Sequence, residues 1–216
     1  MIGNVFDLSD RLVDDLMALS PIGATFVGVD GFDHLWDDLS PEGIETRKVL
    51  LNRYREAFES LPEGQDRWER LAARVGLEYL DEWLDGIAHG DPWRDLNTVA
   101  SPLQDIRQVF DQMDTTTTAG WENIATRMES LHAVIGGYQQ TLEDGRRQGL
   151  LVARRQVLAG IEEAAINAGA ASYFASVPER FRESVAGSAE LRARIEEGSQ
   201  AARDSFARFG EYLQET

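Results

Sequence analysis

Three histidines are the first residues to consider, because an imidazole can bind a metal or move a proton near neutral pH. His34, His89 and His132 lie far apart, and none belongs to a His-Glu-x-x-His zinc motif. Glu129 and His132 have the Glu-x-x-His spacing of di-iron helical bundles, but such a site needs a second copy and two more carboxylates. The sequence holds no second copy. We expect His132 at the flank of a helix seam, and a di-iron oxidase remains an open alternative.

The acidic residues suggest two further kinds of site. Four aspartates at positions 30, 33, 37 and 38 lack the alternating ligand spacing of an EF-hand loop, so we expect a turn rich in caps. The adjacent pairs Glu162-Glu163 and Glu196-Glu197 point about 100° apart on a helix. Neither pair can act as a matched acid and base, and we interpret both as solvated faces. The chain has no cysteine and no Gly-x-Ser-x-Gly elbow, which excludes those nucleophiles.

The segment from Asp91 to Met113 is the most unusual part of the chain. It holds two prolines, a tryptophan, two arginines and several amides between long helical patterns. Its polar side chains have two interpretations: they cap helix ends and join the loop to the core, or they face a ligand or channel. The second interpretation gives the binding candidates, which are Asn97, Gln104, Arg107, Arg154 and Arg155. We predict no catalytic residue and no metal ligand in this chain.

Composition places the chain among globular proteins and limits its partners. The 216 residues are 43% apolar and 27% charged, with a net charge of −17. So much negative charge repels phosphate backbones and anionic lipids, so neither nucleic acid nor membrane is an expected partner. No run of about 20 apolar residues and no secretory signal is visible. A cytoplasmic location is the resulting expectation.

Hydrophobic spacing of three and four residues predicts an all-α fold without a sheet. We expect a single domain over 1–216, an irregular array of about seven to nine helices with antiparallel neighbours. Ser9 should cap the first helix, Gly28 and Gly149 should end two others, and the threonines 115–118 should serve as linker and cap. The expected helices cover about 10–19, 21–27, 42–61, 65–89, 102–112, 118–148, 153–168 and 188–213.

Three apolar patterns predict how the helices pack. The helix at about 65–89 has one stripe from Trp68 to Trp83 and another from Leu77 to Ile87. A helix that is apolar on two sides normally lies between neighbours, so we predict that it is central. Heptad-like seams run over 121–142 and 191–213, and either could also form a homodimer surface. Phe32, Leu35 and Trp36 should lie beneath the loop at 28–39.

The segment Trp93-Arg94-Asp95-Leu96-Asn97-Thr98-Val99-Ala100-Ser101-Pro102-Leu103-Gln104-Asp105-Ile106-Arg107-Gln108-Val109-Phe110-Asp111 resembles the amino-terminal half of the bacterial family called domain of unknown function 885 (DUF885). Softer matches occur in the expected order at 19–25, 38–43, 121–128 and 149–157. The resemblance covers essentially the whole chain. Only the central segment is distinctive.

This resemblance implies a helical, zincin-like protein more than twice as long, whose carboxy-terminal half carries a His-Glu-x-x-His helix and looks like a zinc-dependent peptidase. Zinc and the general base would then belong to that half. The chain would be an amino-terminal fragment or truncated member, inert alone, that forms one wall of a substrate channel. Its partners would be its own catalytic half and a peptide-like substrate, and the helix seams leave a homodimer as a further expectation. The alternative is a self-contained acidic interaction module.

Overall fold

The computed structural model describes residues 4–62, 66–184 and 187–216, and this part of the chain is helical with no strand. The predicted all-α fold is confirmed. The α-helices are α1 Val5–Leu19, α2 Pro21–Val27, α3 Pro41–Glu59, α4 Arg67–Ala88, α5 Pro102–Gln108, α6 Thr118–Gln148, α7 Arg154–Ala168, α8 Tyr173–Ser184 and α9 Ala189–Glu215. Two short 3₁₀ turns, η1 Pro92–Arg94 and η2 Val109–Asp111, flank α5. None of the described helices combines the length and the apolar content that a bilayer crossing needs.

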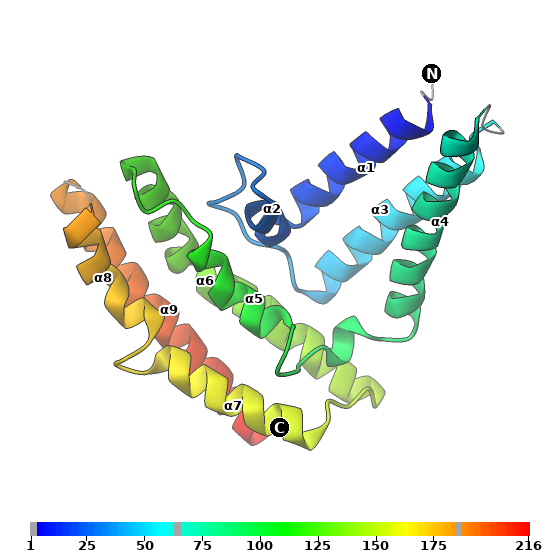
Figure 1. The fold of residues 1–216 in the computed structure, drawn as a ribbon. Helices are drawn as coiled ribbons and strands as arrows, with labels where there is room; N and C mark the ends of the chain where they lie inside the picture. The colour runs from blue at the N-terminus through cyan, green and yellow to red at the C-terminus, as the bar shows by residue number, and fades with distance from the viewer. Residues whose placement is uncertain (1–3, 63–65, 185–186) are drawn as a thin grey trace.

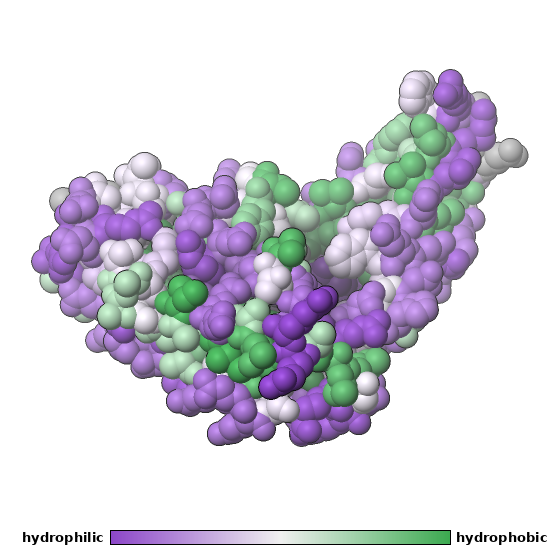
Figure 2. Space-filling view, turned by 60° about the horizontal axis from the view of Figure 1, so that its bottom comes forward, coloured by the Kyte–Doolittle hydropathy of each residue, from purple (hydrophilic) through white to green (hydrophobic). Residues whose placement is uncertain are grey.

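The helices form an arm and a body that meet in a V (Figure 1). The arm consists of α1, α3 and α4, and α5 to α9 run side by side in the body. Each part has its own cluster of buried apolar side chains. The arm projects from the body and carries hydrophobic residues on its surface (Figure 2). Residues of the arm and residues of the body can therefore line a common space at the inner angle of the V.

Helix α6 is the central element of the body, because its seam is buried along its whole length. Trp121, Ile124, Met128, Leu131 and Tyr138 are all at most 1% exposed. The seam packs against α9, whose Ile195, Phe206 and Phe209 are equally buried. Tyr138 stacks on Phe209 with ring centroids 5.5 Å apart. Both predicted seams are therefore covered within the chain, and a homodimer would have to use another surface.

The prediction that the helix at 65–89 is central is wrong. Its stripe with Leu80 and Ile87 packs on α1 and α3, as expected for one side of a buried helix. The other stripe faces outward: Trp68 is 64% exposed and Val75 is 56% exposed. The two-sided pattern was real, but the described residues cover the second side only in part. Tertiary neighbours, which the pattern cannot count, decide whether such a face is buried.

Most predicted helix ends are confirmed by their cap geometry. Gly28 and Gly149 end α2 and α6 with φ of +75° and +79°. The hydroxyl of Thr117 accepts from the Gly120 amide at the start of α6. The first helix starts earlier than predicted, because the side chain of Asn4 caps it. Ser9 lies inside α1, where its hydroxyl donates to the Val5 carbonyl.

Helix α8 lies between two of the expected helices, at positions where none was predicted, and it contains a proline after its first turn. Pro178 has no amide hydrogen, so it cannot donate to the carbonyl of Phe174 four residues earlier. The hydroxyl of Ser199 on α9 donates to that carbonyl instead, at 2.7 Å. Phe174 itself is fully buried, so this hydrogen bond replaces a missing one in the core.

Candidate functional site

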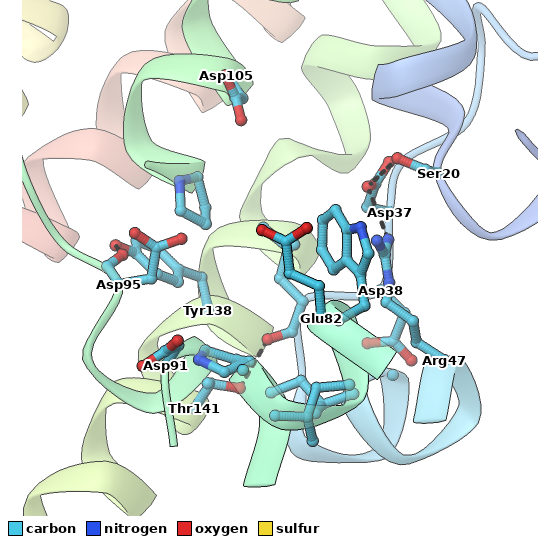
Figure 3. Close-up of a pocket in the computed structure, with 18 of the residues that line it drawn as sticks. Ser20, Asp37, Asp38, Arg47, Glu82, Asp91, Asp95, Asp105, Tyr138 and Thr141 are labelled. Atoms are coloured by element: carbon cyan, nitrogen blue, oxygen red, sulfur yellow. Dashed lines mark hydrogen bonds and ion pairs between the residues drawn. The ribbon is translucent and has the colours of Figure 1, made fainter. Parts of the chain in front are cut away.

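A cleft of about 610 Å³ lies in the angle between the arm and the body (Figure 3). Helices α3 and α4 form one side of it, and η1, α5 and α6 form the other. Six carboxylates and one arginine line it, together with the aromatic rings of Tyr79 and Trp83. The charged residues are Asp37, Asp38, Arg47, Glu82, Asp91, Asp95 and Asp105. The cleft therefore has a strongly negative lining.

The first two of these carboxylates belong to the loop between α2 and α3, and Arg127 of α6 holds this loop in place. The guanidinium donates to the carbonyls of Pro21, Phe32 and Leu35, at 3.0 to 3.2 Å. It also donates to the Thr25 hydroxyl at 2.9 Å. The Arg127 side chain is fully buried, and this burial lowers its pKa to about 10.

Within this loop the aspartates act as caps, as the sequence predicted. Asp37 accepts from the amide of Ile22 and the hydroxyl of Ser20, both at 2.8 Å, and so closes the start of α2. Asp38 accepts from the Ser40 amide. Trp36 packs against the core of the body, but Leu35 is 41% exposed, so its predicted burial is wrong. These two hydrogen bonds fix the position of the Asp37 carboxylate at the edge of the cleft.

On the opposite side, Asp95 follows η1 and is held by the body. The hydroxyl of Tyr138 donates to the main-chain carbonyl of Asp95 at 2.6 Å. Asn97 donates to its carboxylate at 3.1 Å. A Cβ at Gly145 would lie 2.1 Å from the carbonyl oxygen of Trp93, so only glycine lets η1 lie this close to α6.

Electrostatics in the cleft favour a positively charged partner. Burial, together with the nearby charges of Asp105 and Asp91 and against the hydrogen bond from Asn97, raises the pKa of Asp95 to about 6. Burial also raises the pKa of Asp105 and of Asp37. These shifts mean that bringing the carboxylates together has an electrostatic cost. A cation bound among them would remove part of that cost.

Four of the six carboxylates in the cleft form no ion pair with any residue that the structure describes: Asp38, Glu82, Asp95 and Asp105. Two of these, Asp38 and Asp95, accept hydrogen bonds from Ser40 and Asn97. In contrast, Asp91 pairs with Arg94 at 2.9 Å. Arg47 lies 3.6 Å from Asp37 and has its guanidinium 5.8 Å from the centre of the Trp83 ring. Figure 3 shows the carboxyl groups of Glu82, Asp91, Asp95 and Asp105 around the same opening.

Asp95 is the lining residue whose pKa is shifted closest to neutrality. Asp95 can exchange a proton near pH 6, but no histidine, lysine or cysteine lines the cleft to act with it. In residues 4–62, 66–184 and 187–216, no group of three or more His, Asp or Glu side chains could hold a metal ion. Zinc therefore does not fit the described residues of this chain, and we derive no step through it.

The histidine that matched the di-iron spacing lies outside the cleft. His132 is exposed on α6, and its Nδ1 lies 3.1 Å from the Glu129 carbonyl. The Glu129 carboxylate is occupied by Arg194 of α9, which donates to both of its oxygens at 2.7 and 2.9 Å. The described part of the chain therefore offers no carboxylate–histidine cluster of the di-iron kind at this place.

Asn97 and Gln104 use most of their hydrogen-bonding capacity within the chain. Asn97 accepts from the amides of Val99 and Ala100 and donates to the Ala100 carbonyl. Gln104 accepts from the Ser101 amide and donates to the Asn97 carbonyl and the Glu163 carboxylate. These bonds cap α5 and connect the loop to α7. This agrees with the interpretation that the polar side chains of the segment cap helix ends and join the loop to the core. A ligand-facing role for them stays a prediction.

The three predicted arginines lie apart from the cleft. Arg107 pairs with Asp111 at 3.0 Å, and its guanidinium lies 4.2 Å from the centre of the Tyr173 ring. Arg154 and Arg155 are exposed at the start of α7, and Arg154 borders a second, more apolar hollow near the end of α9. Their binding role also stays a prediction. One of the expected solvated glutamates, Glu163, is half-buried against Gln104, whereas Glu196 and Glu197 are exposed.

Sequence reasoning missed the residues that line the cleft, because they come from several segments that lie far apart in the chain. Glu82 and Asp105 looked like ordinary surface acids of helices. A usable signal was glycine within strong helical patterns, at Gly43 and Gly145. A Cβ at Gly43 would lie 2.0 Å from the carbonyl oxygen of Asp38. Both glycines mark places where a second segment approaches a helix beside the cleft.

Comparison with known families adds a single, extensive match. The family described as "Bacterial protein of unknown function (DUF885)" matches residues 21–216, which include every element from α2 to α9. The chain belongs to the DUF885 family. No curated protein matches it. Every residue that lines the cleft, except Ser20, falls within the DUF885 match.

Proposed function

We propose that this chain forms one wall of a substrate cleft in a larger DUF885 protein, and that the cleft holds a peptide segment with positively charged groups. In this proposal the remainder of the protein supplies the catalytic groups of a zincin-like peptidase, as the resemblance implies. The chain's own residues bind and orient the substrate and are inert without that remainder. The observation that carries the proposal is the acidic cleft between the arm and the body.

The lining fits a basic peptide in three respects. Six carboxylates against one arginine attract lysine or arginine side chains or a free amino end. Tyr79 and Trp83 are 40% and 45% exposed, so their ring faces can receive a cation or an apolar side chain. The volume of about 610 Å³ is within the range of sites that hold small ligands or a few peptide residues.

A direct binding measurement tests the first part of this proposal. Isothermal titration of the chain with a short lysine- and arginine-rich peptide should show saturable binding that weakens as salt is raised. The matched peptide with glutamate at the basic positions should not bind. Replacing Glu82 and Asp105 together by Gln and Asn should weaken binding of the basic peptide about tenfold. Equal affinity for both peptides would refute the charge-based assignment.

The second part concerns the division of labour, and peptide cleavage tests it. The chain alone should leave a fluorogenic peptide library intact, and a longer DUF885 gene product that contains it should cleave some members. The cleft substitutions Glu82→Gln and Asp105→Asn should then raise KM for basic substrates with a smaller effect on kcat. Cleavage by the isolated chain would overturn the assignment as a wall.

A second candidate function, a self-contained interaction module, is favoured by one observation. The outward stripe of α4 exposes five large apolar residues in a row, which soluble proteins seldom leave uncovered. Such a face is expected for a helix that binds another helix or domain. The peptide titration separates the two functions, because a module of this kind gives no preference for basic peptides.

A further inference from the structure

The outward stripe of α4 is a continuous apolar row that the described part of the chain leaves largely exposed. It consists of Trp68, Leu71, Val75, Tyr79 and Trp83, which are between 40% and 64% exposed. Their spacing of three and four residues places all five on one face of the helix. Gly86 continues the same face at its carboxyl end.

The charges on α4 are largely divided by sign along the helix. Its first half carries Arg67, Arg70 and Arg74 with a single acid, Glu69, and its second half carries Glu78, Asp81, Glu82 and Asp85. Glu69 suits the positive end of the helix macrodipole, but Asp85 lies near the negative end, where a base is favoured. The acids of the second half therefore cost the isolated helix some stability, and they need another explanation.

Several of these charges form no ion pair within the part of the chain that the structure describes. Arg74, Glu78, Glu82 and Asp85 form no side-chain ion pair with any other residue between 4 and 62, 66 and 184, or 187 and 216. Asp81 differs, because it pairs with Arg55 of α3. At 100° per residue, Arg74, Glu78 and Asp85 lie along one flank of the apolar row. A basic and an acidic segment thus follow each other beside an uncovered apolar face.

We propose that two copies of this chain pair through α4, antiparallel, about a two-fold axis at the level of residue 77. Antiparallel pairing places the basic half of each helix beside the acidic half of the other. Because a two-fold axis brings the same flanks together, Arg74 of one copy lies next to Glu78 of the second, and the reverse contact forms as well. The charge order that is unfavourable within one helix is therefore favourable between two antiparallel helices.

The same register matches large side chains with small ones. Val75 lies opposite Tyr79 of the second copy, and Leu71 lies opposite Trp83. Trp68, the most exposed member of the row, lies over Gly86 of the second copy, at the mouth of the cleft. Facing positions that alternate in size interdigitate well. A Cβ at Gly76, the other glycine of α4, would lie 2.6 Å from Phe58 of α3, so Gly76 faces α3 and not this row.

The size of this contact sets the expected strength of the dimer. A helix of 22 residues is about 33 Å long and about 10 Å wide, so two copies bury on the order of 660 Å² in total. Stable interfaces bury roughly 1,200 Å² or more. Pairing through α4 alone therefore gives a weak dimer, with a Kd in the micromolar range or above.

Sedimentation velocity over a wide concentration range tests the proposal. The wild-type chain should shift from monomer to dimer as concentration rises from about 5 to about 500 μM. Leu71→Glu and Val75→Glu should remain monomeric, and circular dichroism should confirm that both are folded. The matched control is Leu158→Glu, on the exposed face of α7, which should leave the dimer unchanged. If the wild-type chain stays monomeric over this whole concentration range, the proposal is overturned, and the apolar row of α4 must bind something other than a second copy.

Charge reversal tests the antiparallel register. Arg74→Glu alone should abolish the dimer, since the new carboxylate would face Glu78 of the second copy, and Glu78→Arg alone should do the same by bringing two bases together. An equimolar mixture of the two variants restores an opposite-charge contact and should dimerise like the wild type. Failure of the mixture would rule out this register. The four substituted α4 positions lie outside the cleft lining, so the variants should still bind the basic peptide if the proposed function is correct.

Discussion

The indole N–H of Trp36 donates a 3.0 Å hydrogen bond to the main-chain carbonyl of Arg127, while the Arg127 guanidinium lies 5.3 Å from the centre of the Trp36 ring. Each residue therefore fixes the other, although 91 positions separate them. The pair attaches the loop between α2 and α3 to the central helix of the body. It thereby sets the position of Asp37 and Asp38 at one side of the cleft.

Arg127→Met should be strongly destabilising, because the carbonyls of Pro21, Phe32 and Leu35 lose their donor while they remain covered. We expect the free energy of unfolding in urea to fall by about 3 kcal/mol. Arg147→Met is the matched control, since Arg147 is an exposed arginine of the same helix that pairs only within α6. It should change stability by less than about 0.5 kcal/mol. Equal effects of the two substitutions would contradict this account of Arg127.

Asp95→Asn should stabilise the chain above pH 6 and have little effect below pH 4. The pKa of Asp95 is about 6 in the folded chain, against 3.8 as its ordinary value. The folded state therefore binds the proton more tightly, so Asp95 contributes stability at low pH that is lost as pH rises towards and through 6. Asparagine keeps an acceptor for Asn97 and carries no charge. Melting temperatures of the two proteins at pH 5 and pH 8 should differ more at pH 8, and the opposite order would refute the assigned shift.

Local features of the fold followed from the sequence because each has a local cause. Ser40 and Thr117 cap helices through their own hydroxyls, and Gly28 and Gly149 end helices through a positive φ. The seam of α6 was visible for a similar reason, since apolar residues that recur every three or four positions from Trp121 to Leu142 are typical of a buried helix face. The expected start at Ser9 failed because Asn4 is an equally good cap one turn earlier.

The cleft could not be predicted in this way, because it depends on how the arm meets the body. Asp37, Glu82 and Asp105 come from three elements whose relative placement no periodicity encodes. The role of α4 was missed for the same reason, since its outward stripe and its buried stripe look alike in the sequence. Gln104 illustrates a third case: its amide was recognised as special, but its partner, Glu163 of α7, is 59 positions away.

Ser199→Ala should destabilise the core by about 1 to 2 kcal/mol, because it leaves the Phe174 carbonyl without a donor. The cause assigned here is the missing amide hydrogen of Pro178, and a double-mutant cycle checks it. In a Pro178→Ala background residue 178 can donate to Phe174, so the loss of the Ser199 hydroxyl should cost less. Ser130→Ala, which removes a hydroxyl bonded within the surface of α6, is the control. Strict additivity of the two substitutions would show that Ser199 does not replace the missing donor.

Two single substitutions in the cleft should change affinity for a basic peptide in opposite directions. Glu82→Gln removes a carboxylate without an ion-pair partner among the described residues, so affinity should fall about threefold. Arg47→Gln removes the one base in the lining and frees Asp37 from its ion pair, so affinity should rise by a similar factor.

The double variant should return close to the wild-type affinity, and all four proteins should converge in about 1 M salt because charges are screened there. Glu211→Gln, at an exposed position of α9 outside the cleft, should change nothing. A fall in affinity for both cleft variants would indicate a general loss of structure, and a fall only for Arg47→Gln would indicate an anionic ligand. Opposite signs together with the salt dependence would tie binding to the charge of this cleft.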